Sequence, residues 1–425
     1  MTARTNLRLR GRFDPPGDKS IGHRLAFLAA ISRGRSRLEA FPPGRDCAST
    51  LELIRALGVE VSEEGSRVTV VGRGLGGLRA PLSDLDAGNS GSTARMATGL
   101  LAGQSFDSRI VGDSSLSRRP FDRVVNPLIE MGGVFETTDG RLPLRVLGGH
   151  PLHGISYTLP VPSAQVKTAV LFAGLFASGR TIVRESTLSR THTEIGLAGF
   201  GIPVVVTKGS VSIDGGRDPI GNEFRIPGDF SSAAFFVGGA ACFPGSDLVV
   251  HGVGLNPTRT GFLRALRAMD ADVEWETAPS PAGEPMGTIR VRGRELHGFT
   301  LDPSEIPSLI DEIPILAVVA AFAKGTTRLE GLGELRVKES DRLHAIQQGL
   351  IALGAYIEPL EDGLVIHGHP GELRPARLRS YGDHRMVMAW AIASLGVAGE
   401  CEIDHLDQVK ISYPGFWETL NRLLC

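Results

Sequence analysis

A regular internal repeat is the feature of this 425-residue sequence that most restricts its fold. Six apolar segments rich in alanine and glycine recur roughly 70 residues apart, and each is predicted to be a helix. They begin near residues 20, 91, 164, 230, 311 and 384. Because they are apolar on most of their faces, we expect them to lie inside a domain rather than on its surface.

The segments between the apolar helices also recur. A more amphipathic helix is expected after each one, near residues 47, 121, 191, 258, 339 and 413. Several of these helices end at glycine, which suits a left-handed cap. Alternating runs with polar turns then predict hairpins at residues 59–72, 203–215 and 356–368. The sixth copy lacks its hairpin, and a strand near residues 6–13 could supply part of what is missing.

This arrangement predicts an α/β protein with six βαβαββ-type repeats, three in each of two globules. The first globule would be discontinuous, with residues 1–17 and 228–425, and the second would contain residues 18–227. The chain would cross between them twice. A single solenoid of six helix pairs is the alternative, but solenoid repeats usually have about 20–50 residues.

Composition excludes several classes of partner. The chain has 45 Lys and Arg against 47 Asp and Glu, so it has no strong overall field for nucleic acid or acidic membranes. No apolar run approaches the ~18 residues of a membrane span, and no apolar leader is evident at the start, so we expect a cytoplasmic protein. The cysteines have no metal-ligand spacing, so we expect reduced thiols and no metal at Cys47, Cys242, Cys401 and Cys425.

The loops before the apolar helices carry the unusual residues. The first is GDKSIGHR at 17–24, which places two cations and a hydroxyl at a helix start, where backbone N–H groups favour an anion. No glycine directly precedes Lys19, so this is not a Walker A loop. Only six lysines accompany 39 arginines, which makes each lysine a candidate for a special position. Each motif taken alone is equally compatible with a charged helix cap or a tight turn.

The common placement of such motifs in successive repeats is more informative than any one of them. It would gather cations around one cleft that suits two small phosphorylated or carboxylated molecules. Asp311, Glu339 and Lys338 then become candidates for acid and base catalysis, while Glu312 and Asp341 can be solvated surface charges. The cations are Lys19, Arg24, Arg119, Arg190, Lys338, Arg342, Arg385 and Lys410.

Eight motifs in this order resemble the 5-enolpyruvylshikimate-3-phosphate synthase family: GDKSIGHR, GNSGSTAR, GDSSLSRRP, SAQVKTA, SRTHTE, LIDEIP, LRVKESDR and YGDHRM. The resemblance covers residues 15–410. It implies a two-domain inside-out α/β barrel with the active site in the cleft between the domains. It also implies transfer of the enolpyruvyl group of phosphoenolpyruvate to the 5-hydroxyl of shikimate 3-phosphate, with release of phosphate and without a metal or organic cofactor.

The resemblance further assigns roles by position. Asp311 would accept the hydroxyl proton, and Glu339, helped by Lys19, would protonate the methylene carbon. The residues expected to bind shikimate 3-phosphate are Lys19, Ser20, Arg24, Ser163, Gln165, Arg190, Asp311 and Lys338. Those expected to bind phosphoenolpyruvate are Lys19, Gly91, Arg119, Gln165, Arg342, Arg385 and Lys410.

Some positions depart from the family pattern. Ala164, His192 and Glu334 stand where many members have Ser, Tyr and Asn, so their contacts are not transferred. The motifs GDK, SAQVK, RTHTE and NPTR (256–259) are similar to the second class of the family, known for herbicide-tolerant members. Tolerant members often have Ala at the position of Gly91, so we expect intermediate inhibition by glyphosate, competitive with phosphoenolpyruvate.

Two other functions are weighed against this one. A related enolpyruvyl transferase acts on UDP-N-acetylglucosamine, but it uses a cysteine in the loop that corresponds to residues 112–120, where this chain has none. A non-catalytic anion-binding scaffold would tolerate loss of Asp311, Glu339 or Lys19, yet all three are present. We expect a monofunctional monomer whose partners are the two small substrates.

Overall fold

The computed structural model describes residues 7–278 and 283–425, which form a mixed α/β fold of two compact units. The described part of unit 1 comprises residues 7–16, 227–278 and 285–425, and that of unit 2 comprises residues 17–226 and 283–284. The prediction placed Gly283 and Glu284 with residues 228–425. They belong instead to unit 2, where Glu284 Oε1 lies 2.7 Å from His192 Nδ1.

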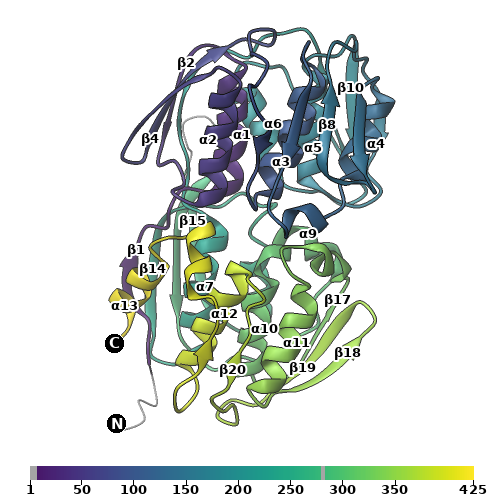
Figure 1. Cartoon of the computed structure of the whole chain (residues 1–425). Coiled ribbons are helices and arrows are strands. Elements are labelled where there is room, and N and C mark those ends of the chain that lie inside the picture. The colour runs from purple at the N-terminus through teal and green to yellow at the C-terminus, as the bar shows by residue number, and fades with distance from the viewer. Residues whose placement is uncertain (1–6, 279–282) are drawn as a thin grey trace. The chain divides into compact units, whose positions relative to one another are not determined.

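Unit 2 contains six α-helices, coloured purple to teal in Figure 1. They are α1 (Lys19–Ala30), α2 (Arg45–Ala56), α3 (Gly91–Ala102), α4 (Asp122–Glu130), α5 (Ala164–Gly174) and α6 (His192–Gly199), with a short 3-10 helix η1 (Leu116–Arg118). Its strands are β2 (Arg33–Glu39), β3 (Glu60–Glu64), β4 (Arg67–Arg73), β5 (Leu85–Asp86), β6 (Ser108–Val111), β7 (Val134–Thr138), β8 (Arg141–Leu147), β9 (Ser156–Thr158), β10 (Arg180–Arg184), β11 (Val205–Thr207), β12 (Ser210–Asp214) and β13 (Glu223–Arg225).

Unit 1 contains α7 (Phe230–Cys242), α8 (Gly261–Ala268), α9 (Ile306–Leu309), α10 (Ile313–Phe322), α11 (Arg342–Ala352), α12 (His384–Leu395) and α13 (Phe416–Leu423). Its strands are β1 (Arg10–Phe13), β14 (Asp247–Gly254), β15 (Asp272–Ala278), β16 (Met286–Arg292), β17 (Gly325–Glu330), β18 (Tyr356–Leu360), β19 (Gly363–Gly368), β20 (Arg377–Leu378) and β21 (Glu402–Ile403). Its 3-10 helices are η2 (Pro303–Glu305), η3 (Ile310–Glu312), η4 (Gly333–Val337) and η5 (Leu406–Ile411).

The described strands form six sheets, and none of them closes into a barrel. Unit 2 has the four-stranded sheets β13-β2-β4-β3, β5-β6-β8-β7 and β11-β12-β10-β9, and unit 1 has β1-β14-β16-β15, β17-β19-β18 and β20-β21. In each four-stranded sheet one pair of strands is parallel and the others are antiparallel. The hairpins predicted at residues 59–72, 203–215 and 356–368 are present as β3-β4, β11-β12 and β18-β19.

Two strands belong to a different unit from the helix that follows each of them in the chain. β1 precedes α1 in the chain, yet it pairs in parallel with β14 of unit 1, from Arg10 opposite Asp247 to Phe13 opposite Val250. β13 precedes α7, yet it pairs in parallel with β2 of unit 2. The N-terminal segment also pairs with the end of the chain, where Leu9 bridges Leu424 in antiparallel fashion and Cys425 N donates to Arg8 O at 3.1 Å. That this strand supplies part of the sixth copy stays a prediction. Residue 6 of that predicted strand lies outside the described residues.

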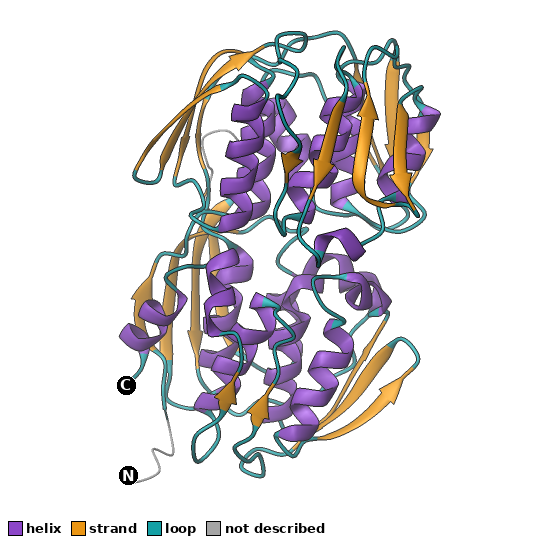
Figure 2. Ribbon diagram, viewed as in Figure 1, coloured by secondary structure: helices purple, strands orange, loops and turns teal. Residues whose placement is uncertain are grey.

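Within each unit the helices gather together and the sheets lie around them (Figure 2). The six apolar segments predicted from the sequence are helices α1, α3, α5, α7, α10 and α12, and most of their residues are buried. Every residue of α10 is buried, as expected for a segment that is apolar on all sides. Among the helices in the described part of the chain, none is both long and apolar enough to cross a membrane.

Helices α3 and α5 approach each other closely because of one glycine. A Cβ atom at Gly99 in α3 would lie 2.1 Å from the carbonyl oxygen of Ala169 in α5 and 2.7 Å from its Cα. Only a hydrogen atom fits between these two backbones. This close contact also fixes the relative position of the first turns of the two helices, where Gln165 Nε2 donates to Ser92 Oγ at 2.9 Å.

We predict that Gly99→Ala destabilises unit 2. Alanine favours a helix by roughly 1 kcal/mol over glycine, but the methyl group would force two backbones apart, at a cost of about 1–3 kcal/mol or more. Gly196→Ala in α6 is the control, because its Cβ would meet only side-chain atoms, at 3.2 Å and 3.6 Å. Urea unfolding should give a lower midpoint for Gly99→Ala than for Gly196→Ala. Equal midpoints would show that α3 and α5 are not in backbone contact.

Candidate active site

Side-chain caps lie at the starts of five of the six apolar helices, all except α10. Asp18 Oδ1 accepts from Ile21 N at 3.0 Å, and Ser90 Oγ accepts from Thr93 N at 3.1 Å. Corresponding caps are supplied at α5, α7 and α12 by Ser163, Asp229 and Asp383. Such caps satisfy N–H groups that the helix itself leaves unpaired. Predicted site residues therefore lie in or beside first helical turns: Lys19, Ser20, Gly91, Ser163, Gln165 and Arg385.

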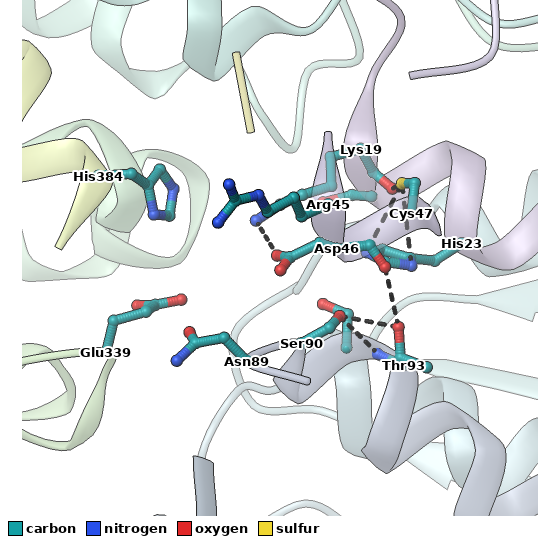
Figure 3. A network of polar contacts seen from close by, with 12 residues as sticks. Lys19, His23, Arg45, Asp46, Cys47, Asn89, Ser90, Thr93, Glu339 and His384 are labelled. Atoms are coloured by element: carbon teal, nitrogen blue, oxygen red, sulfur yellow. Dashed lines mark hydrogen bonds and ion pairs between the residues drawn. The ribbon is translucent and has the colours of Figure 1, made fainter. Parts of the chain in front are cut away.

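Lys19 is held by a carboxylate that the motif analysis did not single out. Its Nζ donates to Asp46 Oδ2 at 2.8 Å, and both side chains are nearly buried. Asp46 is tied in turn to α3, because Thr93 Oγ1 lies within hydrogen-bond distance of its backbone oxygen, at 3.3 Å, and of Ser90 Oγ, at 2.8 Å (Figure 3). The only sequence signal for Asp46 is an acidic residue in the first turn of a helix. The ammonium group of Lys19 is thus placed by two helices besides its own.

His23 lies fully buried behind Lys19. Its Nδ1 is 2.7 Å from Thr50 Oγ1, and its Nε2 is 3.9 Å from Cys47 Sγ (Figure 3). Burial lowers the pKa of His23 well below its usual value, and the charges of Lys19 and Arg24 lower it further. The ring is therefore neutral at physiological pH. Cys47 is not in a disulfide, and neither are the other three cysteines.

Arg24 joins three segments of unit 2. Its Nε donates to Thr193 Oγ1 at 2.8 Å, its Nη1 to Ser20 O at 2.7 Å and its Nη2 to Ala164 O at 3.2 Å. Burial lowers the pKa of Arg24 to about 10, and Arg190 contributes in the same direction. The guanidinium still carries its charge at neutral pH. Arg190 Nη1 donates to Ser20 Oγ at 3.4 Å, so the predicted ligands Ser20, Arg24 and Arg190 lie together.

Gly91, Arg119 and Gln165 also come together, at the start of α3. A Cβ atom on Gly91 would lie 3.2 Å from Arg119 Nη1, which shows how near that guanidinium is to the backbone. Arg119 Nη2 donates to Asn89 Oδ1 at 3.0 Å. Gln165 Oε1 accepts from Arg95 Nη1 at 3.2 Å. Asn89 and Arg95 belong to the GNSGSTAR motif, although neither was predicted as a site residue.

Lys167 has a different role from the other lysines in motifs. Its side chain has no exposed surface, and its Nζ lies 2.9 Å from Glu185 Oε2 and 2.7 Å from Glu194 Oε1. Ser189 Oγ donates to the carboxylate of Glu185. These contacts connect α5 to the segment that carries Arg190. The compact ammonium expected of a retained lysine is used here to fix a loop.

In unit 1 the carboxylate of Asp311 is surrounded by guanidinium groups. Its Oδ1 lies 3.5 Å from Arg342 Nη1, and its Oδ2 lies 3.5 Å from Arg385 Nη2 and 3.6 Å from Arg259 Nη1. Arg342 Nη2 also donates to Glu339 Oε2 at 2.5 Å. The structure thus brings together four predicted residues, and it adds Arg259, which the sequence analysis used only as part of a class signature.

Arg342 is the centre of this group. Its Nε donates to Asp383 Oδ2 at 2.7 Å, and neither side chain is exposed by more than 1 %. Burial alone lowers the pKa of Arg342, but Asp383, Glu339 and Asp311 outweigh that effect and raise it above its ordinary value. Burial likewise opposes ionisation of Asp383, but Arg342 lowers the pKa of that carboxyl below normal. Both groups are therefore charged at neutral pH.

The remaining predicted residues are less closely connected. Lys338 is partly buried and precedes Glu339, whereas Lys410 is exposed in η5 and forms no ion pair with this group among the described residues. Of the two residues considered as solvated charges, Asp341 is exposed and caps α11, but Glu312 is only 1 % exposed. The surface interpretation of Glu312 is wrong, because its carboxylate accepts from Ser231 Oγ inside unit 1. His192 forms a hydrogen bond with Glu284. The backbone carbonyl of Ala164 accepts a hydrogen bond from Arg24.

Comparison with known proteins identifies the family. The sequence profile described as EPSP synthase (3-phosphoshikimate 1-carboxyvinyltransferase) matches residues 3–420. The chain belongs to the EPSP synthase family. A 3-phosphoshikimate 1-carboxyvinyltransferase of Alkalilimnicola ehrlichii is 49% identical over 412 residues, covering 96% of this chain and 92% of the relative. One of Solibacter usitatus is 46% identical over 415 residues, covering 98% and 97%.

Solved structures agree with this assignment to the EPSP synthase family. EPSP synthase of Acinetobacter baumannii superimposes with a TM-score of 0.88 at 39% identity, covering 99% of this chain and 97% of that one. The enolpyruvyl transferase NikO of Streptomyces tendae gives a TM-score of 0.78 at 18% identity, which shows a shared fold only. The chain is thus a transferase whose α/β architecture extends beyond the EPSP synthases.

We predict that Lys167→Met destabilises unit 2 by about 3–5 kcal/mol, because two buried carboxylates would lose their cation. Lys208→Met, at an exposed lysine, is the matched control and should change stability by about 0.5 kcal/mol or less. Chemical unfolding of both variants measures the difference. A Lys167→Met protein as stable as the control would mean that the three groups are not buried together as described.

We also predict that His23 makes the protein sensitive to acid. Because the folded state holds this ring neutral, protons bind preferentially to the unfolded chain below the ordinary histidine pKa of about 6.5. This contribution to stability is present above that pH and is lost as the pH falls. Between pH 6 and 5, wild-type stability should fall more steeply than that of His23→Gln, by up to about 1.4 kcal/mol per pH unit.

His153→Gln, at an exposed histidine, is the control and should leave the slope of stability against pH unchanged. Urea unfolding at several pH values gives these slopes, whatever the absolute stability of each variant. Parallel slopes for wild type and His23→Gln would contradict a buried neutral ring.

Proposed function

We propose that this protein transfers the enolpyruvyl group of phosphoenolpyruvate to the 5-hydroxyl of shikimate 3-phosphate, giving 5-enolpyruvylshikimate 3-phosphate and phosphate. The family assignment and the names of relatives up to 49% identical support this reaction. The structural observation that carries it is the carboxylate of Asp311 within 3.5 Å of both Arg342 and Arg385. A proton acceptor beside two anion-binding side chains suits attack by a hydroxyl on an anionic substrate.

The proposed chemistry uses two carboxyl groups. Asp311 accepts the proton of the 5-hydroxyl, while Glu339, assisted by Lys19, protonates the methylene carbon of phosphoenolpyruvate. The hydroxyl oxygen then bonds to the cationic carbon and forms a tetrahedral adduct. A methyl proton then returns to Glu339 while the bond between carbon and the phosphate oxygen breaks, which restores the double bond. The proton held by Asp311 passes to the departing phosphate, so both carboxyl groups return to their starting protonation states. The arginines stabilise the negative charges that gather on the adduct.

The binding roles follow the residue sets given by the resemblance, and the contacts described above support parts of them. Shikimate 3-phosphate would be bound by Lys19, Ser20, Arg24, Ser163, Gln165, Arg190, Asp311 and Lys338. Phosphoenolpyruvate would be bound by Lys19, Gly91, Arg119, Gln165, Arg342, Arg385 and Lys410. The proposal requires one substrate pair to meet both sets, because Lys19 belongs to unit 2 and Asp311 to unit 1.

We extend the proposal to the architecture. Six copies of a βαβαββ-type unit would build the chain, three in each unit, in the inside-out arrangement expected from the sequence. The six sheets and six buried helices support this division. Action as a cytoplasmic monomer without a metal or organic cofactor stays a prediction. Sedimentation, cell fractionation and assay in the presence of a chelator would test these three points.

Glyphosate is proposed to compete with phosphoenolpyruvate. A methyl group at position 91 would lie close to Arg95 Nη1 and Arg119 Nη1, at 2.6 Å and 3.2 Å. Residue 91 therefore borders a predicted ligand of phosphoenolpyruvate. With glycine there, steric exclusion of a longer phosphonate is absent, which supports the expectation of intermediate inhibition.

We predict that Lys19→Met stays folded, although less stable because Asp46 loses its cation, and loses nearly all turnover, since the variant lacks the ammonium that both substrates are proposed to share. Phosphate release from phosphoenolpyruvate and shikimate 3-phosphate measures it, with Lys208→Met as the control at an exposed lysine. Circular dichroism and the unfolding midpoint check the fold. More than about a tenth of wild-type kcat in Lys19→Met would contradict the assignment.

The same assay separates the other functions considered. Phosphate release with UDP-N-acetylglucosamine in place of shikimate 3-phosphate would favour the related transferase. Binding of both anions without any phosphate release would favour a scaffold.

A further inference from the structure

The Asn-Pro-Thr-Arg segment at residues 256–259 forms a tight turn between β14 and α8. Asn256 Oδ1 accepts from Thr258 N at 3.0 Å and from Thr258 Oγ1 at 2.7 Å, and Arg259 N donates to Asn256 O at 2.8 Å. Asparagine at the first position and proline at the second are the residues that such a turn favours. Arg259, which closes the turn, is only 2 % exposed.

The side chain of Arg259 connects the start of α7 to the catalytic candidate. Its Nη2 donates to Ser231 Oγ at 2.9 Å and lies 3.5 Å from Asp229 Oδ1. Its Nη1 lies 3.6 Å from Asp311 Oδ2. Asp229 is itself fixed, because it caps α7 through Ser231 N at 2.7 Å. One edge of the guanidinium is therefore anchored on a buried helix while another nitrogen faces the carboxylate.

Ser231 extends this connection to the neighbour of Asp311. The serine hydroxyl donates to the carboxylate of Glu312, which is 1 % exposed. Asp311 and Glu312 both belong to the short helix η3 (Ile310–Glu312). The two carboxylates of η3 thus meet the same cluster: Asp311 lies 3.6 Å from Arg259 Nη1 in an ion pair, and Glu312 accepts a hydrogen bond from Ser231. Buried charged groups linked in this way have little freedom to reorient.

We propose that Arg259 is a positioning residue of the transfer reaction, which holds the carboxylate of Asp311 ionised and oriented to accept the substrate hydroxyl proton. The inference rests on the proposed function and adds to it a residue that need not touch either substrate. Arg342 and Arg385 are themselves proposed ligands of phosphoenolpyruvate, so their contacts with Asp311 must be shared with that substrate. Arg259 is not among the proposed ligands of either substrate, so its ion pair with Asp311 need not be shared with a substrate during the reaction.

The charges around Asp311 determine what loss of Arg259 should do. Guanidinium groups face it from the turn before α8, from α11 and from α12, at Arg259, Arg342 and Arg385. The carboxylates joined to those cations are Asp229, Glu339 and Asp383, and Glu312 is adjacent in η3. Removing one of three cations makes the carboxylate easier to protonate. Only ionised Asp311 can act as the base. As the pH is lowered, the variant should therefore lose activity at a higher pH than the wild type.

The test compares Arg259→Met with Arg259→Lys in the full-length protein. For Arg259→Met we expect kcat to fall about 10- to 100-fold, with KM for both substrates within about threefold of wild type. The acid limb of the pH profile of kcat should move up by about one pH unit. Arg259→Lys keeps a cation but lacks the fork, so it should return the acid limb to its wild-type position with only partial recovery of kcat.

Arg264→Met is the matched control. Arg264 lies one turn further along, in α8, is partly exposed and pairs with Glu305. Its Nη1 also donates to Pro257 O in the turn at 3.5 Å, so this control includes any effect that reaches Asp311 only through the backbone of the turn. Its removal should leave kcat and the pH profile unchanged. A purely structural role for Arg259 would lower the unfolding midpoint without moving the acid limb. An unmoved acid limb in folded Arg259→Met overturns the proposal.

Ser231→Ala keeps the test decisive if Arg259→Met does not fold. It removes the 2.9 Å anchor and leaves the charge of Arg259 in place, so kcat should fall several-fold while the acid limb stays where it is. Wild-type kcat in folded Ser231→Ala would also overturn the proposal. Wild-type protein in the same assay separates the two hypotheses: no phosphate release rejects the proposed function, whereas normal release with unaffected variants rejects only the role of Arg259.

Discussion

The pairing of buried lysine and arginine side chains with carboxylates from other segments is the constraint on which the rest of this structure depends. Cations at the starts of apolar helices leave water on folding, and an unpaired charge there would be very costly. Asp46 pairs with Lys19, and Asp383 pairs with Arg342. Each of these carboxylates belongs to another segment than its cation, so the pairs also fix segments relative to one another. The contacts that lower the energetic cost of burying these charges therefore also fix the positions of the site residues.

The charged groups of the site are arranged differently in the two units. In unit 2, His23 is kept neutral beside Lys19 and Arg24, so a third positive charge does not add to their repulsion. In unit 1, Arg342 contacts three carboxylates, and its charge is secured by them. The first arrangement leaves cations facing hydroxyl and amide groups that an anion can replace. The second holds acid and base groups beside a permanent cation, as proton transfer on an anionic substrate requires.

Much of the fold could be predicted because its signals are local. Apolar runs in the sequence predict the six buried helices α1, α3, α5, α7, α10 and α12. The motifs at the starts of these helices point to site residues such as Lys19 and Gln165. Contacts between distant segments left no local pattern. Asp46 is one acidic residue among many until the structure places it beside Lys19. Glu312 is compatible with a surface position in the sequence, because its partner Ser231 is far away in the chain. The partner strand of β1 was missed for the same reason.

β1 and β13 each pair with a strand in a different unit from the helix that follows them, and this affects how the protein can fold while it is synthesised. Residues 17–226 include β13, so every described strand of the three sheets of unit 2 has been made before most of unit 1 leaves the ribosome. Unit 2 can therefore complete its core during translation, as domains generally do. β1 is among the first segments made, yet its partner β14 comes only after residues 17–226 of unit 2. β1 must therefore stay unpaired with β14 while unit 2 folds. The exposed arginines at positions 10 and 12 help during this period, because charged side chains oppose pairing with a wrong strand.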